Sequence, residues 1–178
     1  VIERATRREV PQLPEIAIRE AVANALIHQD FGITGAGPLI EVFSNRVEIT
    51  NPGVPLVDTM RILNDPPRSR NEQMAALLRR LDLCEEAGSG WDKMVAACEL
   101  RQLPAPRIET AGNNTRVVLF ADIPFKNLTP DERRMGCYWH ACVKYANADA
   151  ATNKSLRERF GLSDSQSAQV SRLVRECM

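Results

Sequence analysis

Apolar and polar positions alternate along part of the chain and follow a helical period elsewhere, which predicts its strands and helices. Residues 39–50 (LIEVFSNRVEIT) alternate on both sides of a Ser-Asn pair, so we expect a β-hairpin with one buried face. Residues 108–110 and 115–121 predict a second hairpin. Residues 72–83 carry apolar side chains at i, i+3, i+4 and i+7, which predicts a helix packed on the core.

The stretch 16–31 (IAIREAVANALIHQDF) predicts a helix that is apolar nearly all round. Its polar exceptions, Glu20, Asn24 and His28, are four residues apart and therefore lie on one stripe. A buried polar group without a partner costs on the order of 1–3 kcal/mol, so these side chains need partners. We expect the stripe to face a pocket.

The order of these elements, with a further helix over 91–100, predicts the fold class. A helix, a hairpin, a loop, two helices and a second hairpin favour an α+β two-layer sandwich, with helices on one face of an antiparallel or mixed sheet. A proline-bounded stretch at 124–130 marks a boundary. We therefore expect one domain over 1–125 and another over 126–178.

The second domain has the pattern of a helix-turn-helix. Helices are predicted at 131–145, 152–160 and 165–177, with a glycine-containing turn before the last. On that plan, side chains of the last helix reach base edges of duplex DNA and neighbouring basic residues lie near phosphates. The candidates for base edges are Ser165, Gln166, Gln169 and Arg172, and those for phosphates are Lys154, Arg157 and Arg175.

The charge of this segment keeps an alternative open. From Leu128 onward the chain has eight basic and six acidic residues, a net charge of only +2. A DNA-binding surface is usually more basic, so a small helical bundle that mediates dimerisation is the second interpretation.

Composition indicates a soluble globular protein of the cytoplasm that does not enter a membrane. Basic and acidic residues balance at 23 each, no apolar run is long enough to span a bilayer, and the N-terminus lacks a signal-peptide core. Five irregularly spaced cysteines without a CxxC pair favour buried thiols in a reducing compartment over a zinc site. The missing initiator Met and the abrupt end at Met178 lead us to expect a piece of a longer protein.

The polar stripe also carries a resemblance. Glu-x-x-x-Asn-x-x-x-His resembles the N-box of the GHKL ATP-binding fold, and REAVANALIHQDF resembles the signature of the RecG-helicase-like C-terminal ATP-binding domain family. The segments RVEITNPG at 46–53, SRN at 69–71 and EAGSG at 86–90 fit the same family. The resemblance covers roughly 1–125 and implies a GHKL-like fold without a helicase motor. It also implies an upstream AlbA-like domain and a C-terminal winged helix, here truncated before the wing.

The resemblance implies roles for individual residues. Asn24 would offer its carbonyl oxygen to Mg²⁺, and Glu20 would orient or deprotonate water in a slow ATPase. His28 would line the site, fix Asn24, or be structural. Asn51 stands where the wider fold has an Asp that binds adenine, although a β-turn closing the hairpin explains it equally well. The other residues assigned to nucleotide are Gly53, Arg70, Gly88, Ser89 and Gly90.

Two segments of the chain could also bind phosphate on physical grounds. A Gly-x-Gly turn that opens a helix, as at 88–90, presents free backbone N–H groups to an anion. Residues 68–71 (RSRN) can offer donors to a triphosphate, since guanidinium groups suit phosphate oxygens. The alternative is that Ser69 or Asn71 caps the next helix, which would not exclude a ligand there.

The leading hypothesis is a DNA-binding transcriptional regulator that couples binding of ATP and Mg²⁺ to association with duplex DNA, either as a monomer or as a homodimer. The alternative is a degenerate GHKL-like scaffold that binds no nucleotide and serves dimerisation or partner binding. Asn51 and the short Gly-x-Gly turn favour this alternative.

Overall fold

A four-stranded antiparallel sheet forms one layer of the protein. The computed structural model describes residues 2–3, 6–7, 11–62, 66, 68–84 and 90–177. The strand order is β3-β4-β6-β5, and a separate pair of two-residue strands precedes the first helix. The strands are β1 (Ile2–Glu3), β2 (Thr6–Arg7), β3 (Leu39–Val42), β4 (Arg46–Pro52), β5 (Arg107–Ala111) and β6 (Asn114–Phe120).

The register of the two central strands sorts their side chains between two faces. Val47 lies opposite Leu119 and Ile49 opposite Val117, and all four side chains belong to the main core. The intervening residues point to the other face. There Glu48 is ion-paired with Arg46 at 2.5 Å and with Arg116 at 3.6 Å, so charged side chains cover that face.

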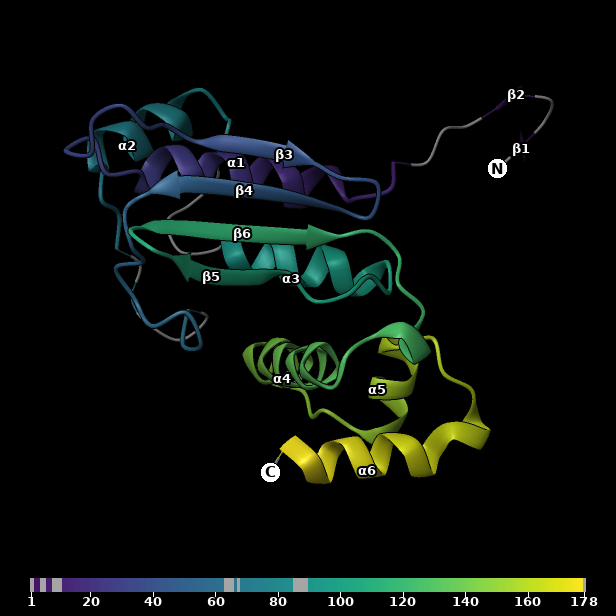
Figure 1. Cartoon of the computed structure of the whole chain (residues 1–178). Helices are drawn as coiled ribbons and strands as arrows, with labels where there is room; N and C mark the ends of the chain where they lie inside the picture. The colour runs from purple at the N-terminus through teal and green to yellow at the C-terminus, as the bar shows by residue number, and fades with distance from the viewer. Residues whose placement is uncertain are drawn as a thin grey trace.

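Helices α1 (Glu15–His28) and α3 (Gly90–Leu100) cover the apolar face of the sheet, and α2 (Glu72–Arg80) packs on α1. Figure 1 shows α1 behind β3 and β4, and α3 behind β5 and β6. Alanines of α1 let this helix pack closely on α3 and the sheet, and Ala17, Ala21 and Ala25 are each at most 3% exposed. The expected two-layer α+β arrangement is confirmed, with an antiparallel sheet.

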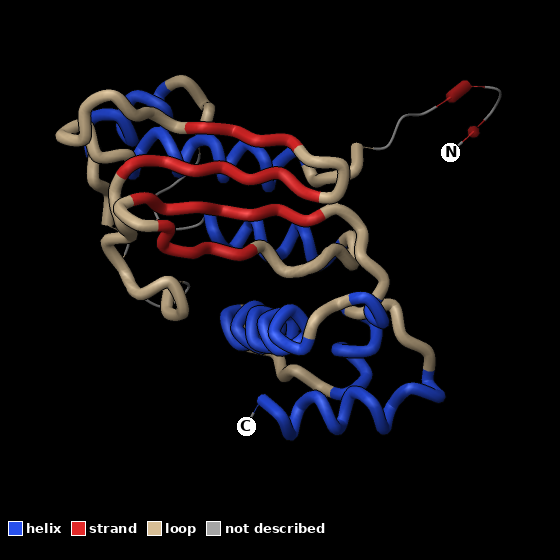
Figure 2. The backbone as a smooth tube through the Cα atoms, viewed as in Figure 1, coloured by secondary structure: helices blue, strands red, loops and turns tan. Residues whose placement is uncertain are grey.

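The C-terminal part is entirely helical, as Figure 2 shows by colour. It contains the 3-10 turn η1 (Phe125–Asn127), α4 (Pro130–Ala146), α5 (Asn153–Arg159), the 3-10 turn η2 (Asp164–Gln166) and α6 (Ser167–Cys177). Its own core includes Phe125, Leu156, Phe160, Val170 and Leu173. Because Trp139 of α4 belongs instead to the main core, α4 packs on both parts of the molecule.

The first helix is shorter than the predicted 16–31. It ends at His28 because Gln29 is extended, with φ −61° and ψ 145°, and the Asp30 N–H donates to the Pro52 carbonyl at 2.8 Å. Residues 29–31 therefore leave the helix to pass beside the end of β4. None of the helices in the described part of the chain combines the length and the hydropathy needed to cross a membrane.

Candidate functional site

A cavity of about 160 Å³ lies between α1, the apolar face of the sheet, the first residues of α3 and the loop that follows β4. The sheet contributes Ile49, Asn51, Thr115 and Val117. The loop contributes residues 54–57, Ile62 and Pro66.

The polar stripe of α1 lines this cavity, since Glu20, Asn24 and His28 all belong to its wall. Glu20 is 3% exposed, and its Oε1 atom has no hydrogen-bond partner in the described structure. Asn24 and His28 likewise make no side-chain hydrogen bond to a described residue. A buried carboxylate oxygen without a partner is costly, so this wall is suited to a ligand that supplies one.

Gly90 allows α3 to begin against the stripe. A Cβ atom at Gly90 would lie 2.9 Å from Glu20 Oε2 and 3.3 Å from Asn24 Nδ2. Any larger residue at this position would therefore require the Glu20 carboxylate or the start of α3 to move. Gly90 and the adjacent Trp91 line the cavity, whereas the candidates Gly88 and Ser89 lie outside the described residues.

The ring of His28 is kept neutral by its surroundings. Burial lowers the pKa of His28 below its usual 6.5, and the nearby Arg70 guanidinium lowers this pKa further. Above that pH the imidazole is uncharged, so one ring nitrogen can accept a hydrogen bond while the other donates.

Asn51 and Gly53 lie at the end of β4 but differ in their surroundings. Asn51 lines the cavity and is 4% exposed; its Nδ2 donates to the Pro52 carbonyl at 3.2 Å, which leaves the side-chain oxygen as an acceptor. Gly53 has φ +101°, and a Cβ there would lie 3.0 Å from the Cβ of Asp30. Gly53 is not part of the cavity wall, and its positive φ explains why glycine occupies this position.

Arg70 holds the end of α1 and is not part of the cavity wall. Its Nε donates to the His28 carbonyl at 3.1 Å, its NH2 group donates to the Val54 carbonyl at 2.8 Å, and its NH1 group is 3.4 Å from Asp30 Oδ2. The expectation that this guanidinium faces a phosphate therefore finds no support in the geometry, because protein oxygens already occupy it.

Asn71 occupies the N-cap position of α2 but does not cap that helix with its side chain. Its Nδ2 donates to the carbonyls of Ile27 at 3.0 Å and Gln29 at 2.8 Å, so it binds the C-terminal end of α1. Capping of α2 by the Asn71 side chain, one of the two capping alternatives, is therefore wrong: its amide group is turned toward the carbonyls at the end of α1, and its oxygen accepts no N–H of α2.

Two arginines face the cavity, and sequence reasoning singled out one of them. Arg68 and Ser69, considered as phosphate donors, line it, and so does Arg79 of α2, which no motif indicated. Both Arg68 and Arg79 are exposed, and neither forms an ion pair with any residue that the structure describes. Trp91 and Cys84 were also missed, because apolar lining residues resemble core residues in a sequence.

The candidate DNA-contacting residues differ in how free they are. Ser165, Gln169 and Arg172 are exposed along η2 and α6, although the Ser165 hydroxyl lies 2.8 Å from that of Ser163 and Gln169 accepts from Gln166 at 3.4 Å. Lys154 is exposed on α5 near Glu158. Gln166 instead accepts from the Ser163 N–H at 3.0 Å in a capping box. Arg157 is bound to Asp164 and to Asn153, with its side chain only 15% exposed, so it is not free to reach a phosphate.

Fold and site together define an α+β domain with a polar-walled cavity under a loop, followed by a helical segment. Residues 35–119 match the family described as "Putative ATP-dependent DNA helicase recG C-terminal". This segment is similar to the RecG-like C-terminal ATPase-like family. The matched segment includes Asn51, Gly90 and the loop over the cavity, and begins after α1 with its polar stripe.

Comparison with solved structures supports the fold alone. The crystal structure of the DIP2311 protein from Corynebacterium diphtheriae superposes with a TM-score of 0.60 and 22% sequence identity, over 99% of this chain. The chain spans 38% of the length of that protein. No curated protein matches the chain.

Proposed function

We propose that this chain binds a nucleotide with Mg²⁺ in the α1 cavity and couples that binding to association with duplex DNA through its helical segment. The observation that carries the proposal is the Glu20 carboxylate, which is 3% exposed, has one oxygen without a partner among the described residues, and lies beside Asn24 in the cavity. Protein structures rarely retain such a group unless a ligand completes its interactions. Residues 35–119 of the chain also match an ATPase-like family.

The residues of the stripe fit Mg²⁺. A carboxylate and an amide oxygen are ligands of the type that this cation prefers, and Mg²⁺ needs few of them because it keeps several waters. Asn24 would hold the ion through its side-chain oxygen, with Glu20 next to it. Bound there, the ion would neutralise phosphate charge. Glu20 would orient a water or take a proton from it through Oε1, in a slow ATPase rather than a helicase motor.

The size and charge of the cavity favour a particular placement of the nucleotide. Its volume of about 160 Å³ is below the roughly 300–1,000 Å³ of most ligand pockets. The base would therefore occupy the interior near Asn51, whose side-chain oxygen can accept from an amino group. The phosphates would extend to the mouth, where Arg68 and Arg79 offer two cationic side chains.

The DNA-binding half of the proposal rests on the exposed side of the last two helices. Ser165, Gln169 and Arg172 lie exposed along η2 and α6, and Lys154 adds a positive charge on α5. A helix-turn-helix places such residues toward the major groove and the neighbouring phosphates. Regulation of transcription would follow from a DNA affinity that depends on bound nucleotide.

Equilibrium binding of a fluorescent ATP analogue tests the first half. We expect binding that requires Mg²⁺ and is reduced at least about tenfold by Asn24→Ala, the loss of one charge-assisted contact. Asn127→Ala is the matched control, because Asn127 is an exposed amide in η1, outside the cavity. Equal affinity in both variants would contradict the proposed site.

A salt titration of duplex binding tests the second half. Arg172→Ala should weaken binding and reduce the slope of log affinity against log salt by about one. Arg80→Ala, which removes an exposed arginine of α2, should change neither. Binding that is as weak as that of an unrelated neutral protein would refute the DNA proposal.

The second candidate function is a scaffold of this fold that binds no nucleotide and serves dimerisation or partner binding. Two observations favour it: the small cavity, and an uncharged amide at Asn51 where the wider fold has a carboxylate. This candidate predicts no binding of the ATP analogue up to millimolar concentration.

A further inference from the structure

The helical segment touches the wall of the cavity through one aromatic pair. Trp91 lines the cavity, and its ring packs edge-to-face on the ring of Trp139 from α4, with centroids 5.7 Å apart and planes at 62°. Both indoles are at most 4% exposed. Trp139 therefore supports this wall from behind, and Trp91 cannot shift outward without displacing it.

The residue next to Trp139 holds the loop over the cavity. The Tyr138 hydroxyl donates to the Met60 carbonyl, in the loop whose residues 54–57 and 62 line the cavity. This contact joins residues 78 positions apart in the sequence. Two consecutive residues of α4 thus reach two different walls of the same site.

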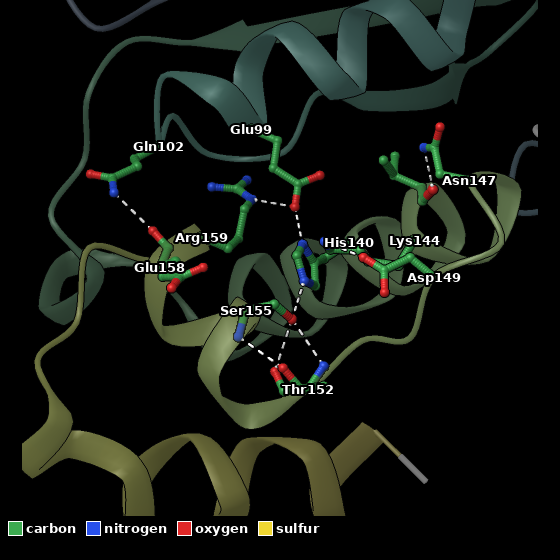
Figure 3. A network of polar contacts seen from close by, with 11 residues as sticks. Glu99, Gln102, His140, Lys144, Asn147, Asp149, Thr152, Ser155, Glu158 and Arg159 are labelled. Carbon is green, nitrogen blue, oxygen red and sulfur yellow. Dashed lines mark hydrogen bonds and ion pairs between the residues drawn. The ribbon is translucent and has the colours of Figure 1, made fainter.

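A buried polar cluster fixes α4 on α3, as Figure 3 shows. Glu99 of α3 accepts a hydrogen bond from the His140 Nδ1 and lies 3.6 Å from the Arg159 Nε, and the His140 Nε2 lies 2.8 Å from the Ser155 hydroxyl. The side chains of His140 and Arg159 are at most 5% exposed. Sliding α4 along α3 would break these buried contacts, so a shift of α3 is passed on to α4 and α5.

We propose that Tyr138 and Trp139 are positioning residues of the cavity, through which the helical segment holds the loop and the Trp91 wall in place. The site of the RecG-like segment is then completed by residues outside 35–119. By linkage, a ligand that orders this loop also tightens the contact between the loop and α4. Conversely, loosening α4 lowers the affinity for the ligand. This last consequence rests on the proposed nucleotide function, whereas the positioning itself does not.

Limited proteolysis of the full chain tests the positioning without any nucleotide. Trypsin can cleave after Arg61 in the loop, and Tyr138→Phe removes only the hydroxyl that holds Met60. We expect cleavage after Arg61 to be about fivefold faster, the equivalent of one hydrogen bond. Cleavage after Arg116, inside β6, reports global unfolding and should be unchanged. Tyr145→Phe is the matched control, because Tyr145 is 80% exposed on the same helix.

Fluorescence tests the link to the ligand, since the chain has only two tryptophans. In Trp91→Phe, addition of Mg²⁺ and a nonhydrolysable ATP analogue should change the emission of Trp139. An unchanged emission while the analogue demonstrably binds would overturn the linkage, and equal cleavage after Arg61 in wild type and Tyr138→Phe would overturn the positioning. If no analogue binds, the proposed function fails, and the proteolysis still decides whether Tyr138 holds the loop.

Discussion

Glu20 is difficult to explain as a purely structural residue. Its carboxylate is buried on a helix that otherwise packs with alanines, and one of its oxygens has no partner among the described residues. If this position served packing alone, an apolar residue would make the fold more stable than the buried carboxylate does. A carboxylate in this position fits a site where a ligand supplies the missing interaction.

Gly90→Ala tests whether the close approach of α3 to Glu20 shapes the site. The added methyl would lie 2.9 Å from Glu20 Oε2, so the carboxylate or the start of α3 must move. We expect affinity for the ATP analogue to fall at least about tenfold, because both Glu20 and Asn24 border the new atom. Gly37→Ala is the control, since a Cβ there meets nothing within 4 Å, and it should leave the affinity unchanged.

His28 makes stability depend on pH in a defined direction. Its pKa is lowered from 6.5 in the folded protein, so below pH 6.5 the unfolded chain binds more protons than the folded one. The free energy of unfolding should therefore fall as the pH drops below 6.5. Urea denaturation at several pH values should show a smaller fall for His28→Gln than for wild type. Identical pH profiles would contradict the burial of a neutral ring.

At the scale of elements, the end of α1 is held by residues from the segment before α2. Arg70 and Asn71 together donate to the carbonyls of Ile27, His28 and Gln29. These bonds place His28 beside the loop over the cavity. They also account for the arginine and the asparagine in this segment, with no need for a ligand.

Asn71→Ala should lower the free energy of unfolding by about 1–2 kcal/mol, because two hydrogen bonds to helix carbonyls are lost. Asn71→Asp keeps the size of the side chain but cannot donate, so it should cost at least as much. Urea denaturation measures both. An Asn71→Asp variant as stable as wild type would show that these bonds contribute little.

Periodicity in the sequence predicted these elements well, and their ends less well. The alternation of apolar and polar residues predicted where both hairpins lie, and the spacing of apolar residues predicted the helices in both parts of the chain. Such patterns reflect local geometry. The helix predicted over 16–31 ends early, since its last residues bond to β4, which is distant in sequence. The side chain of Asn71 did not cap α2 for the same reason, since its partners Ile27 and Gln29 lie 44 and 42 residues away.

At the scale of the whole molecule, the helical segment is joined to the sheet domain by buried contacts rather than by a linker alone. Two hydrophobic cores are present, and the second one includes Phe125 and Leu128 from the expected boundary at 124–130, whereas Trp139, further along the chain, packs in the core that includes the sheet. The sequence could not reveal this, because a buried tryptophan on a helix gives no sign of which core it joins.

Glu99→Ala tests how strongly the two parts are joined. The substitution removes the carboxylate that pairs with Arg159, whose side chain is 4% exposed, and with His140. We expect a loss of about 3–5 kcal/mol in the free energy of unfolding, as for other broken buried ion pairs. Glu158→Ala, which removes a carboxylate whose side chain is 66% exposed, should cost much less. Equal losses would contradict a stabilising junction.

The most direct test of the nucleotide site is a crystal structure of the chain grown with Mg²⁺ and a nonhydrolysable ATP analogue. We predict a metal ion at the side-chain oxygen of Asn24, phosphates between Gly90 and the arginines at 68 and 79, and a base beside Asn51. Saturating analogue with an empty cavity, or analogue bound elsewhere on the surface, would contradict the account.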